Sequence, residues 1–203
     1  MIIGGRNFDT EHKMYIMGIL NVTPDSFSDG GKWNTMDAAL SHTEQIEQGA
    51  DIIDIGGEST RPGHLPIAEA EEIERVIPYI EKIKAEFDIP VSIDTYKPAV
   101  CEEALKAGAD LVNDIWGLKY DEKTASLIAN YNVPCCLMHN RKEAVYENFI
   151  EDVLEDLRQS LAIAQRAGIS KEQIILDPGV GFAKTYEQNL IILNHLERVL
   201  ELG

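Results

Sequence analysis

The sequence contains few cysteines and few cations. Its three cysteines, Cys101, Cys135 and Cys136, do not have the spacing of zinc ligands, and an odd count favours reduced, buried thiols over disulfides. Lys and Arg together number 18 against 35 Asp and Glu, which gives a formal net charge of -17. Binding to nucleic acid or to an anionic membrane requires clustered cations, so the composition argues against both kinds of partner.

Long hydrophobic runs are also missing. No apolar stretch reaches the length of about 18 residues that a membrane-spanning helix needs, and residues 1–20 carry charges where a signal peptide would be apolar. We therefore expect a cytoplasmic protein. The 203 residues are 44% hydrophobic and 26% charged, which is an ordinary globular composition and predicts one domain over residues 1–203.

Short apolar runs alternate with longer amphipathic segments along the chain. After a short N-terminal hairpin, the apolar runs predict strands over 15–20, 51–55, 90–93, 110–112, 133–138 and 174–176. The amphipathic segments predict helices over 36–48, 67–87, 98–107, 121–130, 146–167 and 186–202. This order predicts an α/β protein in which right-handed crossovers join parallel strands. Two architectures fit it: an open doubly wound sheet, or a (β/α)8 barrel, which usually needs about 250 residues.

A polar side chain follows every predicted strand. The residues are Asn21, Glu58, Asp94, Asn113 with Asp114, His139 and Asp177. The carboxyl ends of parallel strands meet on one rim, where barrel enzymes build their active sites. Asp and Asn also cap helices, which explains one or two of these positions, but a shared site explains the whole set better.

Two loops have compositions that suit ligand binding. In DIGGESTRPG (54–63), two glycines allow the backbone to approach a ligand, and Arg61 between Thr60 and Pro62 would recognise an anion, unless this is a solvated surface loop. DPGVGFAKT (177–185) is similar to a phosphate-binding loop at first sight. It lacks the required Gly before Lys, because Ala183 occupies that place, so we expect a rim loop in which Phe182 faces a flat ligand.

Three of the rim residues suit the edge of an amino-pyrimidinone ring. The carboxylates of Asp94 and Asp177 would accept hydrogen bonds from neighbouring N–H groups, while the Asn113 amide both donates and accepts. Ile115 and Met138 would cover the ring faces. His139 has no second His or Cys at ligand spacing and is a poor metal ligand. These residues alone predict a site for a flat heterocycle with a polar edge.

Six motifs, in order, resemble those of the dihydropteroate synthase family. They are NVTPDSFSDGG, DIIDIGGESTRPG, SIDTYKP, LVNDIWG, LMHN and DPGVGFAKT, and they extend over essentially the whole chain. The resemblance implies a (β/α)8 TIM barrel. It also implies an enzyme that condenses 6-hydroxymethyl-7,8-dihydropterin diphosphate with p-aminobenzoate, forming 7,8-dihydropteroate and pyrophosphate.

The resemblance also implies roles for individual residues. Those matching Asp94, Asn113 and Asp177 hold the pterin edge, the one matching Asn21 contacts the magnesium ion that binds the diphosphate, and Thr60 lies on the substrate path. Asp25 would help to stabilise the developing cation. Phe27, Thr60, Arg61 and Pro62 would shape the p-aminobenzoate pocket. The polar run after residue 20 would then be a loop that closes over the site and excludes water.

The sequence departs from the family after its sixth β/α unit. The family continues with a strand bearing Ser-Arg-Lys and another ending in Arg-x-His, whereas this sequence stops at Gly203. We therefore expect a C-terminally incomplete domain with about six units, two unpaired strand edges and exposed apolar helix faces. Such a chain could be inactive alone, and a homodimer is one expected state because the family often dimerises. A non-catalytic pterin-binding protein and the pterin-binding module of a methyltetrahydrofolate methyltransferase are the alternatives; the loop over 21–31 speaks against the second.

Overall fold

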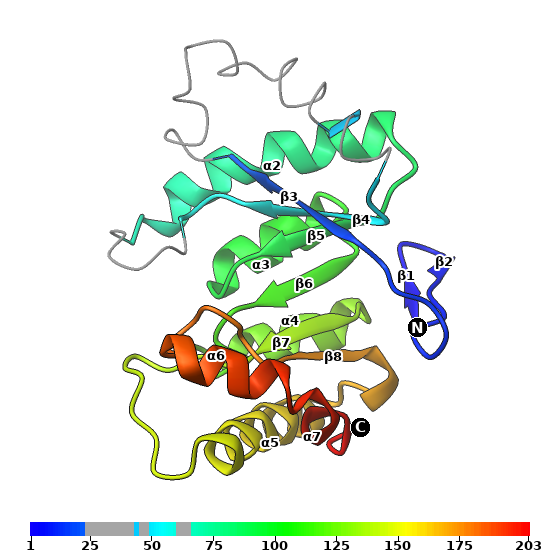
Figure 1. The fold of residues 1–203 in the computed structure, drawn as a ribbon. Coiled ribbons are helices and arrows are strands. Elements are labelled where there is room, and N and C mark those ends of the chain that lie inside the picture. Colours follow the sequence, from blue (N-terminus) through cyan, green and yellow to red (C-terminus); the bar gives the residue numbers. More distant parts are fainter. Residues whose placement is uncertain (23–42, 45–48, 60–65) are drawn as a thin grey trace.

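Six parallel strands form one sheet in the computed structural model, which describes residues 1–22, 43–44, 49–59 and 66–203 (Figure 1). The strands are β3 (Met17–Asn21), β4 (Ile52–Gly56), β5 (Val91–Asp94), β6 (Leu111–Asp114), β7 (Cys135–Met138) and β8 (Ile174–Asp177). Each of them overlaps one of the strands predicted from an apolar run. The predicted N-terminal hairpin is also present, as β1 (Ile2–Ile3) paired with β2 (Arg6–Asn7).

The order of the strands decides between the two architectures. Across the sheet they run β3-β4-β5-β6-β7-β8, so each strand lies beside its predecessor in the sequence. A doubly wound sheet reverses this order at a switch point, whereas a barrel never does. The winding is therefore that of a (β/α)8 barrel. Among the described residues the sheet stays open, with β3 and β8 at its edges, and Ile19 of β3 is 63% exposed.

Helices cover one face of the sheet. These are α2 (Glu69–Glu86), α3 (Pro98–Lys106), α4 (Lys123–Tyr131) and α5 (Phe149–Ala167), followed by a short 3-10 turn, η2 (Lys171–Gln173), before β8 (Figure 1). Their ends follow local chemistry: Pro98 begins α3, the Asp121 carboxylate accepts a hydrogen bond from the Lys123 N–H at 2.9 Å, and Gly168 ends α5 with φ = 90°. The predicted helix over 36–48 lies almost entirely outside the described residues.

The predicted single helix over 186–202 is wrong. The structure has α6 (Tyr186–Leu193) and α7 (Leu196–Leu200), separated by Asn194 and His195, and His195 has a non-helical backbone with φ = -130° and ψ = 32°. Asn and His are weak helix formers, which accounts for a break at this point. Both short helices pack on α5, through Ile192 and Val199. Exposed apolar side chains remain on them, including Leu190, Leu193 and Leu200.

The two faces of the sheet are buried in different ways. Side chains that point outwards, such as Ile53, Ile93 and Leu137, form the main apolar core with the helices. On the inner face, Ile52, Leu111 and Cys136 pack against Ile3 and Phe8 of the N-terminal segment. This segment covers the amino end of the inner face, whereas the carboxyl end carries the polar residues that follow the strands. All three cysteines are buried free thiols, as predicted.

In the part of the chain that the structure describes, no helix is long and apolar enough to cross a membrane.

Candidate active site

Four of the polar residues that follow strands lie on the inner face at the carboxyl end of the sheet. Register places Asn21 beside Gly56, Gly56 beside Asp94, and Asp94 beside Asn113, while Asp177 pairs with Met138 at the same end of the sheet. Residues in register share a face because side chains alternate along a strand. We call Asn21, Asp94, Asn113 and Asp177 the rim residues.

Gly56 allows two rim residues to approach each other. A Cβ atom built on Gly56 would lie 3.2 Å from Asn21 Oδ1 and 3.4 Å from Asp94 Oδ2. Any side chain at this position would push one of the two polar groups aside. The first glycine of the GGE sequence is therefore explained by the crowding of the inner rim.

Asp54 forms the floor beneath the rim. It is 5% exposed, and its Oδ2 accepts a hydrogen bond from Asn113 Nδ2 at 2.9 Å. Within the described residues, Asp54 Oδ1 and the buried Ser92 hydroxyl make no hydrogen bond of normal geometry. Buried polar atoms without partners are costly, so the floor favours a polar occupant.

The carboxylates of the site repel one another. Burial, followed by the charge of Asp54, raises the pKa of Asp94 well above its usual range, and burial also raises the pKa of Asp54. The thiol of Cys136, deeper on the inner face, has a raised pKa because of burial and then the charges of Asp177, Asp54 and Asp94. Three carboxylates therefore act on one small region. A ligand that brings N–H donors would relieve their repulsion.

Apolar side chains stand beside these polar groups. Ile115 and Met138 form a cluster with Tyr96, and Phe182 and Trp116 pack against it. The residues predicted to cover the faces of a flat ring, Ile115, Met138 and Phe182, thus lie together at the same end of the sheet as the rim residues. Such a combination of an apolar wall and a few polar groups is typical of small-molecule sites.

Known proteins resemble this chain over nearly all of its length. Residues 17–203 match the family of pterin binding enzymes. The dihydropteroate synthase of Clostridium beijerinckii is 60% identical over 204 residues, which cover 100% of this chain and 76% of the relative. That of Bacillus subtilis is 57% identical, covering 95% of this chain and 68% of the relative. The chain belongs to the dihydropteroate synthase family.

Solved structures of dihydropteroate synthases share the fold. The Clostridium difficile enzyme, crystallised in the presence of pteroic acid, has a TM-score of 0.92 and 52% identity, over 97% of this chain and 76% of that one. The Xanthomonas albilineans enzyme with 4-aminobenzoic acid has a TM-score of 0.89 and 43% identity, over 95% and 71% of the two chains. These matches confirm the barrel fold and the family that the motifs predicted.

Two polar residues that follow strands do not face the rim of this dihydropteroate synthase site. The Asp114 carboxylate accepts hydrogen bonds from the backbone N–H groups of Trp116 at 2.8 Å and Leu118 at 3.0 Å, so it shapes the following loop. His139 is fully buried on the helix side, where its Nε2 contacts Asp156 of α5 at 3.0 Å. The prediction that all these groups share a site is wrong for both, because each lies one residue beyond an inward-facing position and alternation turns it to the other face.

Glu58 belongs to a buried ionic cluster instead of the rim. Lys97 Nζ donates hydrogen bonds to Glu58 Oε2 and Glu72 Oε2, both at 2.6 Å, and the Tyr96 hydroxyl donates to Glu58 Oε1 at 2.7 Å. We call Glu58, Glu72 and Lys97 the acid-lysine cluster. It joins the loop after β4 to the loop after β5 and to α2. The sequence did not predict this cluster, because Glu58 and Glu72 are 14 positions apart in the chain and Glu72 and Lys97 are 25 positions apart.

Five predicted site residues, Asp25, Phe27, Thr60, Arg61 and Pro62, lie outside the described residues.

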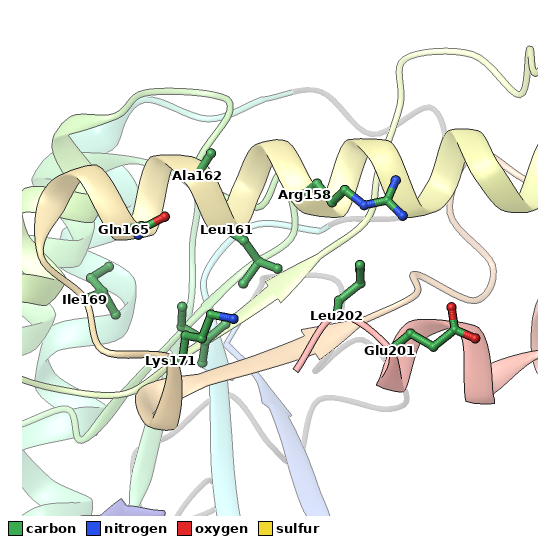
Figure 2. A pocket seen from close by; sticks show the side chains of 9 residues that line it. Arg158, Leu161, Ala162, Gln165, Ile169, Lys171, Glu201 and Leu202 are labelled. Atoms are coloured by element: carbon green, nitrogen blue, oxygen red, sulfur yellow. The ribbon is translucent and has the colours of Figure 1, made fainter.

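A hollow of about 550 Å³ lies away from the rim, between α5, α7 and the start of β8 (Figure 2). Leu161 and Leu202 line it together with the charged ends of Arg158, Lys171 and Glu201. It lies beside the edge strand β8 and on the helix side of the sheet. The rim residues do not contribute to it, so we do not assign the activity to this hollow.

Proposed function

We propose that the rim residues of this dihydropteroate synthase bind 6-hydroxymethyl-7,8-dihydropterin diphosphate and that the chain transfers its pterin-methylene group to p-aminobenzoate. The observation that carries the proposal is the arrangement of Asp94, Asn113 and Asp177 at one end of the inner face, above Asp54. Structures of the Xanthomonas albilineans relative with 4-aminobenzoic acid and with 7,8-dihydropteroate, the product of the proposed reaction, support this assignment.

The polar edge of the pterin would contact Asp94, Asn113 and Asp177. The pterin edge presents neighbouring N–H donors beside a carbonyl acceptor, which match two carboxylates and one amide. Burial and the neighbouring carboxylates raise the pKa of Asp94, and no side chain among the described residues donates a hydrogen bond to it. A pterin N–H would supply such a donor and stabilise the carboxylate form. The flat ring would lie against Met138, Ile115 and Phe182, which pack together at this end of the sheet.

The transfer needs no covalent intermediate with the protein. The C–O bond between the pterin methylene and the diphosphate breaks, and pyrophosphate leaves with the electron pair. The p-aminobenzoate nitrogen forms the new C–N bond and then releases its proton to solvent. Asp25 would stabilise the positive charge on the methylene. Phe27, Thr60, Arg61 and Pro62 would hold the p-aminobenzoate, and these five roles stay predictions.

Magnesium is the proposed cofactor. The described residues contain no group of three His, Cys, Asp or Glu side chains that could hold a metal ion by themselves. In phosphate chemistry Mg²⁺ commonly takes one or two protein oxygens and completes its shell with water and substrate phosphates. The exposed amide of Asn21 at the rim would provide such an oxygen, and the bound ion would neutralise charge on the leaving group. Homodimer formation and a cytoplasmic location likewise stay predictions.

The proposal can be tested with the 203-residue chain itself. Purified chain is mixed with the pterin diphosphate, p-aminobenzoate and Mg²⁺, and pyrophosphate release is measured with and without p-aminobenzoate. We expect release that depends on p-aminobenzoate and that disappears in an Asp94→Ala variant. Pterin binding without release would contradict catalysis by this chain and support the pterin-binding alternative. Absence of both would overturn the proposal.

A further inference from the structure

The loop between β8 and α6, residues 177–185, has an unusual backbone. Gly179, Gly181 and Ala183 have positive φ angles of 69°, 87° and 44°. A non-glycine residue such as Ala183 rarely adopts this conformation, and it persists only where surrounding contacts hold the chain. The loop begins with Asp177 and contains Phe182, both of which lie at the proposed pterin site. The contacts that fix the conformation of this loop therefore also affect ligand binding.

Lys184 holds the loop from within. Its Nζ donates hydrogen bonds to the carbonyl oxygens of Gly179 at 2.8 Å and Phe182 at 3.1 Å, and it lies 2.9 Å from Nδ1 of His139. A lysine ammonium has three N–H donors, and these three acceptors match them. The amine thus joins two points of the loop to the strand end of β7.

His139 is itself fixed by its surroundings. The side chain is fully buried, and its Nε2 lies 3.0 Å from Asp156 Oδ2, which also accepts a hydrogen bond from Arg141 Nε at 2.6 Å. Burial acts to raise the pKa of Asp156, but the hydrogen bond and charge of Arg141 outweigh it and lower that pKa. An ionised Asp156 only accepts hydrogen bonds, so His139 carries its proton on Nε2 and presents the Nδ1 lone pair to Lys184.

The loop also lies directly on the end of β7. The backbone N–H of His139 donates to the Asp177 carbonyl at 2.8 Å. A Cβ atom on Gly179 would lie 2.0 Å from the His139 carbonyl oxygen, so no side chain fits there. At the start of the loop, the Asp177 carboxylate accepts a hydrogen bond from the Gly179 N–H at 2.7 Å. A shift of the loop relative to His139 would therefore move the Asp177 carboxylate.

We propose that His139 and Lys184 are positioning residues for pterin binding, because their contact fixes the 177–185 loop and with it Asp177 and Phe182. This inference rests on the proposed function. The competing explanation is that the buried contact only stabilises the fold. The two explanations differ in what happens to the ligand affinity of a variant that still folds.

The test compares Lys184→Met with Lys142→Met in the full chain. Methionine keeps most of the apolar stem of lysine but has no donor, and Lys142 is an exposed lysine three residues after His139. Binding of 6-hydroxymethylpterin is measured by calorimetry and thermal unfolding by circular dichroism. We expect Lys184→Met to weaken pterin binding about tenfold or more, since it removes hydrogen bonds made by a charged group. Lys142→Met should bind like the wild type.

The outcomes separate the two proposals. If the wild-type chain does not bind the pterin, the proposed function fails. If the wild type binds and folded Lys184→Met binds equally well, the positioning role is overturned, whatever the change in Tm. Should Lys184→Met not fold, ¹⁵N NMR of the wild-type imidazole decides: a proton on Nε2 and none on Nδ1 supports the contact, and a proton on Nδ1 overturns it.

The Tyr146→Phe variant adds a second check, because the Tyr146 hydroxyl donates to the Ala183 carbonyl at 2.8 Å. It should weaken pterin binding by a smaller factor.

Discussion

Asn113 on β6 reaches across β5 and donates a hydrogen bond to Asp54 on β4, with 2.9 Å between Nδ2 and Oδ2. The strand between them, β5, carries Asp94. The contact therefore fixes the orientation of the Asn113 amide in the middle of the proposed pterin site. Asn113 is also in register with Asp94, so two carboxylates lie on the β5 side of its strand.

An Asn113→Ala variant should lose both pterin affinity and some stability. It removes the hydrogen-bond donor to the buried Asp54 Oδ2, which should cost about 1–3 kcal/mol of unfolding free energy. Urea denaturation measures this loss, and calorimetry measures pterin affinity. Asn132→Ala is the control, because Asn132 is exposed at the end of α4 and its replacement should leave the pterin affinity unchanged. Unaltered affinity in Asn113→Ala would remove this residue from the site.

Asp94→Asn should separate stability from function. Burial and the nearby Asp54 charge raise the pKa of Asp94 above its ordinary value of 3.8. The folded state thus binds this proton more tightly than the unfolded state, so Asp94 lowers stability progressively as the pH rises above 3.8. The asparagine variant, which carries no charge, should therefore be more stable than the wild type at pH 7 and equally stable near pH 3. Its pterin affinity should fall sharply. An equal or lower Tm at pH 7 would show that the raised pKa is incorrect.

The fold and the site differ in how far the sequence predicts them. The strands were predictable because each is a short apolar run followed by a polar residue, as in IIDIGGE or VSIDT. The face of the sheet to which each side chain points was not predictable, because a shift of one residue along a strand moves a side chain to the opposite face. For this reason Asp114 and His139 were grouped with the rim residues. The buried ionic contacts were invisible for another reason. Lys97, Glu58 and Lys184 are ordinary charged residues in the sequence, and only the folded chain brings them to their partners.

Removing one partner of the acid-lysine cluster should lower the unfolding free energy strongly. Lys97 is 4% exposed, and the two acidic residues that it contacts, Glu58 and Glu72, are 5% and 1% exposed. Replacing it by Met would leave the buried charges of Glu58 and Glu72 without the cation that neutralises them, at a cost of about 3–5 kcal/mol in unfolding free energy. Lys106→Met is the control, because Lys106 forms exposed ion pairs with Glu102 and Glu103 whose removal should cost less than about 1 kcal/mol. Similar losses in the two variants, measured by urea denaturation, would contradict the role of burial.

Two glycines of the 177–185 loop should respond differently to alanine. Both have positive φ angles, 69° at Gly179 and 87° at Gly181, so either substitution strains the backbone by about 1–2 kcal/mol. Only at Gly179 would the new Cβ clash, with the His139 carbonyl oxygen, whereas nothing lies within 4 Å at Gly181. Gly179→Ala should thus be the less stable variant and should also bind the pterin more weakly. If Gly181→Ala lowers stability and pterin affinity as strongly as Gly179→Ala, the close contact of Gly179 with the end of β7 does not determine either property.

Acid should destabilise the protein partly through His139. Burial, followed by the Lys184 charge, lowers the pKa of His139 from 6.5 to about 4. Between these two values the unfolded chain binds a proton that the folded chain does not, so the contribution of this neutral imidazole to stability is complete above pH 6.5 and is lost as the pH falls towards 4. The full difference corresponds to about 3 kcal/mol.

A His139→Gln variant, whose side chain does not titrate, should be less stable than the wild type at pH 7 but should lose less stability between pH 6.5 and 4. Urea denaturation at several pH values measures both slopes. Equal slopes in the wild type and His139→Gln would mean that folding does not change proton uptake by His139, so that burial and Lys184 do not hold the imidazole neutral in acid.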